Sequence, residues 1–174
     1  MTDNSGLENT GIAMERMVVT RVLDAPRELV WKAWTEPKYV QQWWGPAGFT
    51  MPFCRMDFRE GGRFLYCMKA PDGQEYWSAG EFHQIVPQEK IVLSMYFADA
   101  QGNRVEAAAV GIEHESIPDA RDEVLFEDLG NGQTRLTFTG NETMKHARES
   151  GQLEGMVQIL EKFASVVAGM VAQA

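Results

Sequence analysis

The chain has 174 residues, the length of a single domain, and is long enough to bury about 70% of the surface that its unfolded form exposes. It carries 16 Lys and Arg against 25 Asp and Glu, and this net charge of −9 repels nucleic acids and anionic membrane surfaces. We therefore expect no nucleic-acid partner and no membrane insertion. The first residues contain no basic segment followed by an apolar one, so we expect a cytoplasmic protein whose two cysteines remain thiols.

The beginning of the chain predicts a tail, a strand and two short helices. Residues 1–14 are small, polar and without periodicity, which is typical of a disordered tail, and residues 15–174 are expected to form the one domain. Residues 16–24 are rich in β-branched side chains and predict the first strand. Two short helices are expected next, over residues 27–34 and roughly 37–43.

The middle of the chain, from residue 49 to 139, alternates apolar and polar residues between turn signals. Glu60-Gly61-Gly62, Pro71-Asp72-Gly73 and Gly130-Asn131-Gly132 are typical of tight turns. Strands that follow one another through hairpins pair antiparallel, so we expect about seven strands in one antiparallel sheet.

The first of these hairpins also predicts where the two cysteines lie. If a two- or four-residue loop surrounds the two glycines that follow Glu60, Cys54 lies opposite or diagonal to Cys67 on the same face of the sheet. The two thiols are then near neighbours, and a redox role is a minor hypothesis that depends on this geometry.

Residues 104–120 do not follow the alternation. One helical turn is expected near Ala107 to Ala109, and a connection of this length is typical of a lid or a binding loop. We predict that residues 104–118 form a mobile cover at one end of a cavity between the sheet and a helix.

The last segment, residues 149–174, is the only long run with helical periodicity. Its apolar residues recur every three or four positions, so one face must pack against another part of the protein. Because of its charged and amide side chains, we expect that this segment does not span a membrane. The predicted fold class is therefore α+β, with a curved antiparallel sheet of about six to seven strands around one long C-terminal helix.

The sequence shows no catalytic or metal-binding motif. His83, His114 and His146 are scattered, with neither an HExxH nor a CxxC pattern nearby, and we assign them structural or solvent-exposed roles. We expect no catalytic residue, no cofactor and no metal. Asp57 and Arg55 form either a solvated ionic network or a contact for the polar end of a ligand.

The apolar candidates for a ligand site come from strand alternation and from the helical stripe. Adjacent positions on a short helix cannot point the same way, so Trp43 and Trp44 are the tryptophans most able to leave the core. Inward faces of two strands and of the last helix supply the predicted ligand-binding residues, which are Phe64, Tyr66, Met68, Leu93, Met95, Phe97, Met156 and Leu160. The alternative, that these side chains only fill the core, stays open.

Several segments together resemble a known family. They are DAPRELVWKAWTEPKYVQQWWGP, Asp57, Gly61-Gly62, the PDG turn, Gly80 and IVPQEKIVLS. Over about residues 16–170 the chain resembles bacterial proteins similar to the C-terminal domain of activators of the ninety-kilodalton heat-shock protein ATPase (AHSA1-like), which belong to the START-like (SRPBCC) superfamily. The resemblance implies the helix-grip, or Bet v 1-like, fold: two short helices between the first two strands, and a cavity between the sheet and the last helix.

One departure from the family concerns the wall of that cavity. Many relatives carry a Gly-Trp pair in the last helix, whereas Gly155 is here followed by Met156. A flexible thioether in place of an indole makes the wall more adaptable.

Three functions are compatible with these observations. We favour a domain that binds a small apolar or amphipathic ligand. The first alternative is an enzyme of the polyketide cyclase or hydratase type, and the second is a co-chaperone-like interaction protein. A homodimer is possible. An enzyme should show a buried carboxylate or histidine with a perturbed pKa at an open cavity. A binding module should show a cavity that is almost wholly apolar. An interaction protein should show a contiguous exposed apolar patch.

Overall fold

The computed structural model describes residues 15–174, so the predicted tail at residues 1–14 lies outside the described residues. The elements are, in chain order, β1 (Arg16–Leu23), α1 (Arg27–Thr35), α2 (Pro37–Trp43), β2 (Thr50–Met56), β3 (Arg63–Lys69), β4 (Glu75–Val86), β5 (Lys90–Ala98), the 3₁₀ turn η1 (Ala107–Val110), β6 (Asp122–Gly130), β7 (Gln133–Thr143), α3 (Met144–Ser150) and α4 (Gln152–Ala172).

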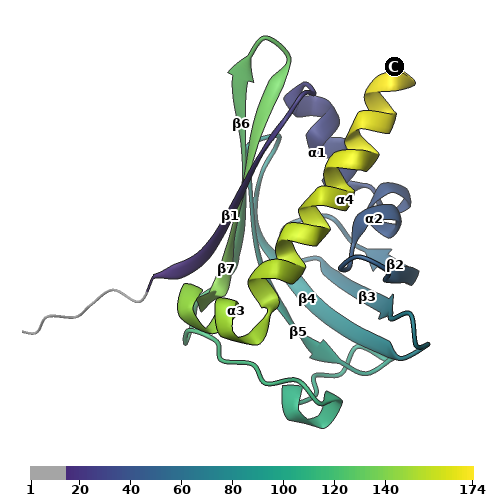
Figure 1. Ribbon diagram of the computed structural model, residues 1–174, viewed down its shortest axis with the longest axis vertical. Helices are drawn as coiled ribbons and strands as arrows, with labels where there is room; N and C mark the ends of the chain where they lie inside the picture. Colours follow the sequence, from purple (N-terminus) through teal and green to yellow (C-terminus); the bar gives the residue numbers. More distant parts are fainter. Residues whose placement is uncertain (1–14) are drawn as a thin grey trace, which may run out of the picture.

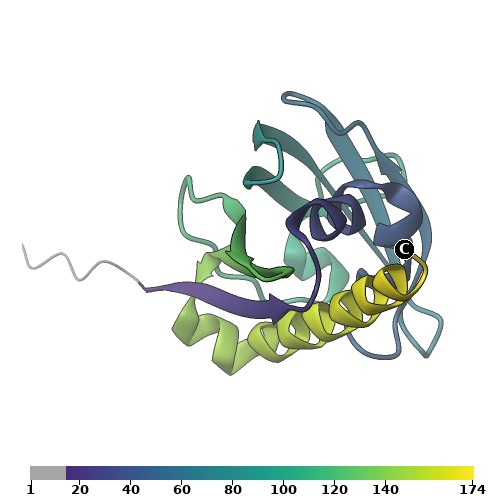
Figure 2. The ribbon, with the colours of Figure 1, turned by 90° about the horizontal axis from the view of Figure 1, so that it is seen from above.

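The seven strands form one antiparallel sheet in the order β1-β7-β6-β5-β4-β3-β2. The first strand of the chain therefore pairs with the last, and the others follow as a meander. The sheet is curved, and α1, α2 and α4 lie on its concave side (Figures 1 and 2). This arrangement confirms the predicted α+β helix-grip fold, including the two short helices after the first strand.

Alternating burial identifies the concave face of the sheet. On β7 every second residue is buried, from Thr134 through Leu136 and Phe138 to Glu142. In a strand, residues two apart share a face, so all of these side chains point toward the helices.

The C-terminal half of α4, which is the upper half in Figure 1, contributes Phe163, Val167 and Met170 to the hydrophobic core. Phe163 is fully buried, and its ring centroid lies 5.2 Å from that of Trp34 and 4.9 Å from that of Trp43. The indole Nε1 of Trp43 donates a hydrogen bond to the Ala33 carbonyl oxygen at 3.0 Å. Full burial of a large apolar side chain contributes roughly 1.5 to 3 kcal/mol, so this cluster fixes α4 against α1 and α2.

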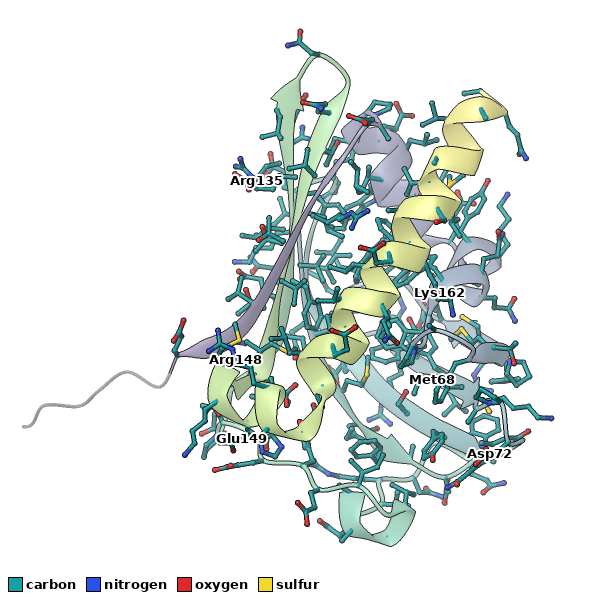
Figure 3. The ribbon with its side chains drawn as sticks, in the orientation of Figure 1. Met68, Asp72, Arg135, Arg148, Glu149 and Lys162 are labelled. Carbon is teal, nitrogen blue, oxygen red and sulfur yellow. The ribbon has the colours of Figure 1, made fainter. Side chains whose placement is uncertain are left out.

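Lys162 joins the same half of α4 to the loop that follows α2 (Figure 3). Its Nζ donates to the carbonyl oxygens of Gly45 and Phe49, both at 3.1 Å, and of Pro46 at 3.4 Å. Burial lowers the pKa of this ammonium, and the three carbonyls replace the water that it loses.

The C-terminal helix differs from the prediction in two respects. It does not begin at residue 149, because Gly151 adopts a φ of 84°, which separates α3 from α4. A left-handed residue ends one helix, and glycine adopts it without strain. By length and hydropathy alone, α4 is apolar enough for a membrane span, so the argument from its polarity was wrong. Its residues buried against α1, α2 and the sheet are instead compatible with the core helix of a soluble protein.

The predicted cysteine arrangement is also wrong. Cys67 faces Phe53 across the β2–β3 hairpin, and Cys54 faces Tyr66. The pairing differs by one residue from the predicted one, and such a shift moves a side chain to the opposite face. Cys54 therefore packs with the concave core while Cys67 lies on the other face, and burial raises the pKa of the Cys54 thiol to about 12.

Candidate functional site

The sheet opens between β5 and β6, and the candidate site lies at this opening. The two strands pair only from Lys90 to Leu93, where Asp122 is the first residue of β6. The rest of β5 continues without β6 beside it and is instead bridged by the returning chain, at Ala98 with Arg104. In the lower half of Figure 1, β4 and β5 accordingly diverge from β6 and β7.

A cavity of about 330 Å³ lies at this divergence, between the sheet and the first turns of α4. Its volume is within the range of small-molecule sites. Apolar side chains come mainly from β5, β7 and α4, and polar ones from β6, β7, α4 and the connection between β5 and β6. The residues used below are Trp44, Met95, Phe97, Arg104, Glu106, His114, Asp122, Phe138, Glu142, Gln152 and Met156.

Three of the eight predicted ligand-binding residues line this cavity, namely Met95, Phe97 and Met156. Tyr66 and Leu93 border a much smaller void of about 20 Å³ that also touches Met95. Met95 therefore lines both voids, and ligand binding by these predicted residues stays a prediction.

The other three predicted residues lie away from the cavity lining. Phe64 and Leu160 are buried in the core, where they contribute to packing. Met68 is half-buried near the end of β3 and lies beside the loop that follows α2 (Figure 3).

The connection between β5 and β6 covers one side of the cavity. Arg104, Glu106 and His114 line it from this segment, and η1 is the expected helical turn. The end of the segment is attached to β7, where Ile117 N donates to the Asn141 carbonyl oxygen at 2.7 Å. Its position is the one predicted for a cover, and its mobility stays a prediction.

Two buried carboxyl groups face the cavity. Asp122 and Glu142 are 8% and 4% exposed, and the backbone N of Asn141 donates to Asp122 Oδ1 at 2.9 Å. Burial raises the pKa of Asp122 to about 6, opposed by that hydrogen bond and by the charge of Arg16. Burial, and then the charge of Asp122, raises the pKa of Glu142 to about 7. Near neutral pH the pair therefore readily holds a proton.

Three buried polar atoms in the described residues 15–174 have no hydrogen-bond partner, and all three belong to residues that line this cavity. They are Trp44 Nε1, Gln152 Nε2 and Glu142 Oε2. Buried polar groups are usually paired, so a concentration of unpaired ones around a single cavity is expected where water or a ligand occupies that cavity.

His114 also lines the cavity, and the structural or solvent role assigned to it stays a prediction. Burial lowers its pKa, followed by the charge of His146, and its ring meets that of Phe97 edge-on with centroids 5.8 Å apart. His146 Nε2 accepts a hydrogen bond from the Glu115 backbone N at 3.2 Å. His83 lies elsewhere, with Nε2 2.9 Å from the Ser94 hydroxyl oxygen.

The polar residues expected near the first hairpin are at the surface. Asp57 Oδ2 lies 2.8 Å from Arg59 Nε, and both side chains are more than half exposed. The solvated network is thus the interpretation that the structure supports for Asp57.

The carboxyl pair was missed, although the sequence holds a signal for it. Asp122 alternates with Val124 and Phe126, and Glu142 alternates with Phe138 two positions beyond Gly140. A carboxylate in phase with buried apolar residues is a candidate for an inward-facing charge. The predicted alternating region ends at residue 139, so the prediction leaves Glu142 outside the strands.

The fold is that of a helix-grip domain, with a cavity between its sheet and its last helix. The sequence profile of the family described as "Activator of Hsp90 ATPase homolog 1-like protein" matches residues 24–168, so the chain belongs to this family. Membership of this family indicates a ligand-binding class of domain. No significant match was found among curated proteins.

Solved structures share the fold. A protein from Nitrosomonas europaea superimposes with a TM-score of 0.72 at 20% identity, covering 92% of this chain and 98% of that one. A protein from Arthrobacter aurescens gives 0.73 at 25% identity, with coverage of 90% and 87%. The AHSA1 protein from Silicibacter pomeroyi gives 0.64 at 21% identity, with coverage of 87% and 96%.

Proposed function

We propose that this protein binds a small amphipathic molecule in the cavity at the opening of the sheet. The observation that carries the proposal is the combination, in one cavity lining, of an apolar wall with three residues that each carry an unpaired buried polar atom. Met95, Phe97 and Met156 suit the apolar body of a ligand, because flexible thioethers adapt to its shape. The unpaired atoms would orient its polar end.

A substitution that fills the cavity tests this proposal. Met156→Trp places an indole in the cavity wall and should weaken the binding of a neutral fluorescent probe such as N-phenyl-1-naphthylamine by at least about tenfold. If the space is open, the free energy of unfolding should change by less than about 1 kcal/mol, whereas overpacking of a filled core costs roughly 1 to 3 kcal/mol.

The matched control is Val157→Trp. Val157 is the next residue on α4, is 36% exposed and does not line the cavity, so an indole there should leave probe binding unchanged. Unchanged binding by Met156→Trp would place the binding site elsewhere and refute the proposal.

Acid–base catalysis is the second candidate, and the carboxyl pair specifically favours it. Asp122 and Glu142 are buried carboxyls with raised pKa values at an open cavity, the feature expected of an enzyme of the cyclase or hydratase type. In such a reaction ionised Glu142 would take a proton from a carbon next to a carbonyl group and return it later.

Deuterium exchange measures this step without knowledge of the natural substrate. An apolar ketone incubated in D₂O with the protein should exchange its α-protons faster than in buffer alone. Glu142→Gln should abolish the acceleration while retaining probe binding. Exchange at the buffer rate in the parent protein would count against catalysis and leave the binding proposal intact.

The third alternative, an interaction protein, has less support. The large apolar residues with the greatest exposure in the described part of the chain come from β1, β2, β6 and α4. They are Val18, Val22, Phe53, Leu129, Val157 and Val171. Because these residues are spread over four elements, we propose no docking surface from them.

A further inference from the structure

The three unpaired atoms at the cavity specify the chemistry of the ligand's polar end. An indole N–H can only donate a hydrogen bond, so Trp44 Nε1 requires an acceptor. The amide nitrogen of Gln152 also donates and is likewise unpaired. Two of the three atoms therefore require a hydrogen-bond acceptor on the ligand.

The third atom, Glu142 Oε2, depends on whether its carboxyl group is ionised. Burial and the neighbouring Asp122 carboxylate disfavour a second negative charge, and they raise the pKa of Glu142 to about 7. Among the described residues neither carboxyl takes part in an ion pair. The protonated carboxyl is a hydrogen-bond donor, and in that state all three atoms at the cavity donate.

The charges around the cavity disfavour an anionic ligand. Even with Glu142 protonated, the carboxyl groups of Asp122 and Glu106 line it, in a chain whose net charge is −9. Arg104 is the one basic Lys or Arg side chain among the described lining residues, and its guanidinium carbon lies over the Tyr96 ring, 5.4 Å from the centroid. These acidic groups would repel a carboxylate or a phosphate, and Arg104 is the one lining Lys or Arg that could pair with it.

A cationic amine fits the carboxyl pair but not the other two groups. An ammonium group has only donors, so it would leave the N–H groups of Trp44 and Gln152 unpaired beside a positive charge. A neutral oxygen acceptor satisfies both N–H groups and the protonated carboxyl without introducing a charge.

We propose that the ligand is a neutral carbonyl compound, such as a ketone or an ester, whose oxygen atoms accept hydrogen bonds from Trp44, Gln152 and Glu142. Its apolar body lies against Met95, Phe97 and Met156. This assignment rests on the proposed binding function and adds the class of ligand. Donors that meet a carbonyl oxygen in this way would also polarise that carbonyl.

Competition among matched ligands tests the class. Four compounds with the same alkyl chain are compared at pH 7 by displacement of the neutral fluorescent probe: the hydrocarbon, its methyl ketone, its primary amine and its carboxylate. The ketone should bind more tightly than the amine and the carboxylate. If either charged compound binds more tightly than the ketone, the assignment is wrong.

Two variants isolate the hydrogen bonds from the apolar contacts. Trp44→Phe keeps an aromatic ring beside Trp43 and Tyr66, whose centroids lie 5.7 and 5.5 Å away, but removes the N–H. Gln152→Leu removes the amide at similar size. Each should weaken ketone binding by about three- to tenfold and leave hydrocarbon binding unchanged or tighter. Equal effects on ketone and hydrocarbon would overturn the assignment.

The carbonyl group itself gives an independent readout. The infrared carbonyl stretch of a ¹³C-labelled ketone should move to lower frequency on binding and return part of the way in each variant. Probe binding without these ketone-specific effects would refute the carbonyl assignment alone. Absence of any probe or ketone binding in the folded parent protein would refute the binding function itself, so the two failures are distinguishable.

Discussion

The two halves of α4 are opposite in character. Toward its C-terminus the helix packs into the closed core, where Phe163 is fully buried between Trp34 and Trp43. Toward its N-terminus, Gln152 and Met156 border the cavity. The same helix thus stabilises the domain with one half and forms a wall of the candidate site with the other, so stability and binding can be altered separately.

The neighbouring residues Trp43 and Trp44 show the same difference. The Trp43 indole N–H is paired with the Ala33 carbonyl oxygen and its ring is 1% exposed. The Trp44 indole N–H has no partner and lies at the cavity. Identical side chains, one position apart, therefore differ in their surroundings, because Trp43 ends α2 and Trp44 already has an extended backbone (φ −68°, ψ 130°).

The largest expected effect comes from truncating the closed half. Phe163→Ala should lower the free energy of unfolding by about 3 to 5 kcal/mol, because it leaves a cavity among buried rings. Met156→Ala, two turns earlier, should cost about 1 kcal/mol or less, because its side chain already borders open space. Urea denaturation measures both, and similar losses would contradict the division of α4 into two halves.

The carboxyl pair should make the open half sensitive to pH. The pKa values of Asp122 and Glu142 are raised in the folded protein from 3.8 to about 6 and from 4.5 to about 7. The folded state then binds protons more tightly than the unfolded chain, so the free energy of unfolding falls as pH rises from about 4 to 7. We expect a decrease on the order of 1 to 3 kcal/mol.

Glu142→Gln separates this effect from that of His114, whose lowered pKa has the opposite sign. The variant should lose much of the decrease and become more stable relative to the parent at pH 8 than at pH 5. Unfolding free energies measured across this range in parent and variant give the comparison. Parallel curves would mean that Glu142 is not held in its protonated form by the fold.

The cover of the cavity should open more easily than the sheet beneath it. Amide hydrogen exchange in residues 104–118 should show protection on the order of tenfold lower, or more, than in β5, because few apolar side chains are buried there. Protection equal to that of residues 90–97 would place the segment in the rigid core and exclude a cover that opens.

The smallest expected effect tests α4 as a helix, apart from its packing. Gly169→Ala, where an added Cβ meets no atom within 4 Å, should raise the free energy of unfolding by about 0.5 to 1 kcal/mol. Gly155→Ala adds a Cβ 3.8 Å from Pro46 Cγ and should give a similar gain. Equal gains, measured by thermal unfolding, would show that the two halves differ in their contacts and not in helix propensity.

Most of the fold could be predicted because its signals are local. Turn residues and alternation indicated seven antiparallel strands, and helical periodicity indicated α4. The cysteine pairing failed because register depends on the length of one turn, and Phe53 rather than Cys54 faces Cys67. A difference of one residue decides the face, and local patterns do not resolve it.

The site could be predicted only in part, for a related reason. Met95, Phe97 and Met156 were found from alternation and periodicity, and they line the cavity. The opening of the sheet, however, arises because β5 continues past the start of β6 at Asp122, which depends on how two strands align. Glu142 lines a cavity only once that alignment exists, although its alternation with Phe138 indicates an inward-facing side chain.

The pairing of β1 with β7 has a consequence for how the protein folds. Arg16 pairs with Thr143 and Leu23 with Thr134, so the contacts that join the first strand to the sheet span more than one hundred residues. During synthesis the hairpins from β2 to β5 can form as they emerge, since their partners are adjacent in the chain. β1 must wait for nearly the whole chain, with Met17 and Leu23 uncovered until β7 arrives. We expect docking of the first strand to be the late, slow step of folding, and the stage at which the nascent chain is most exposed to aggregation.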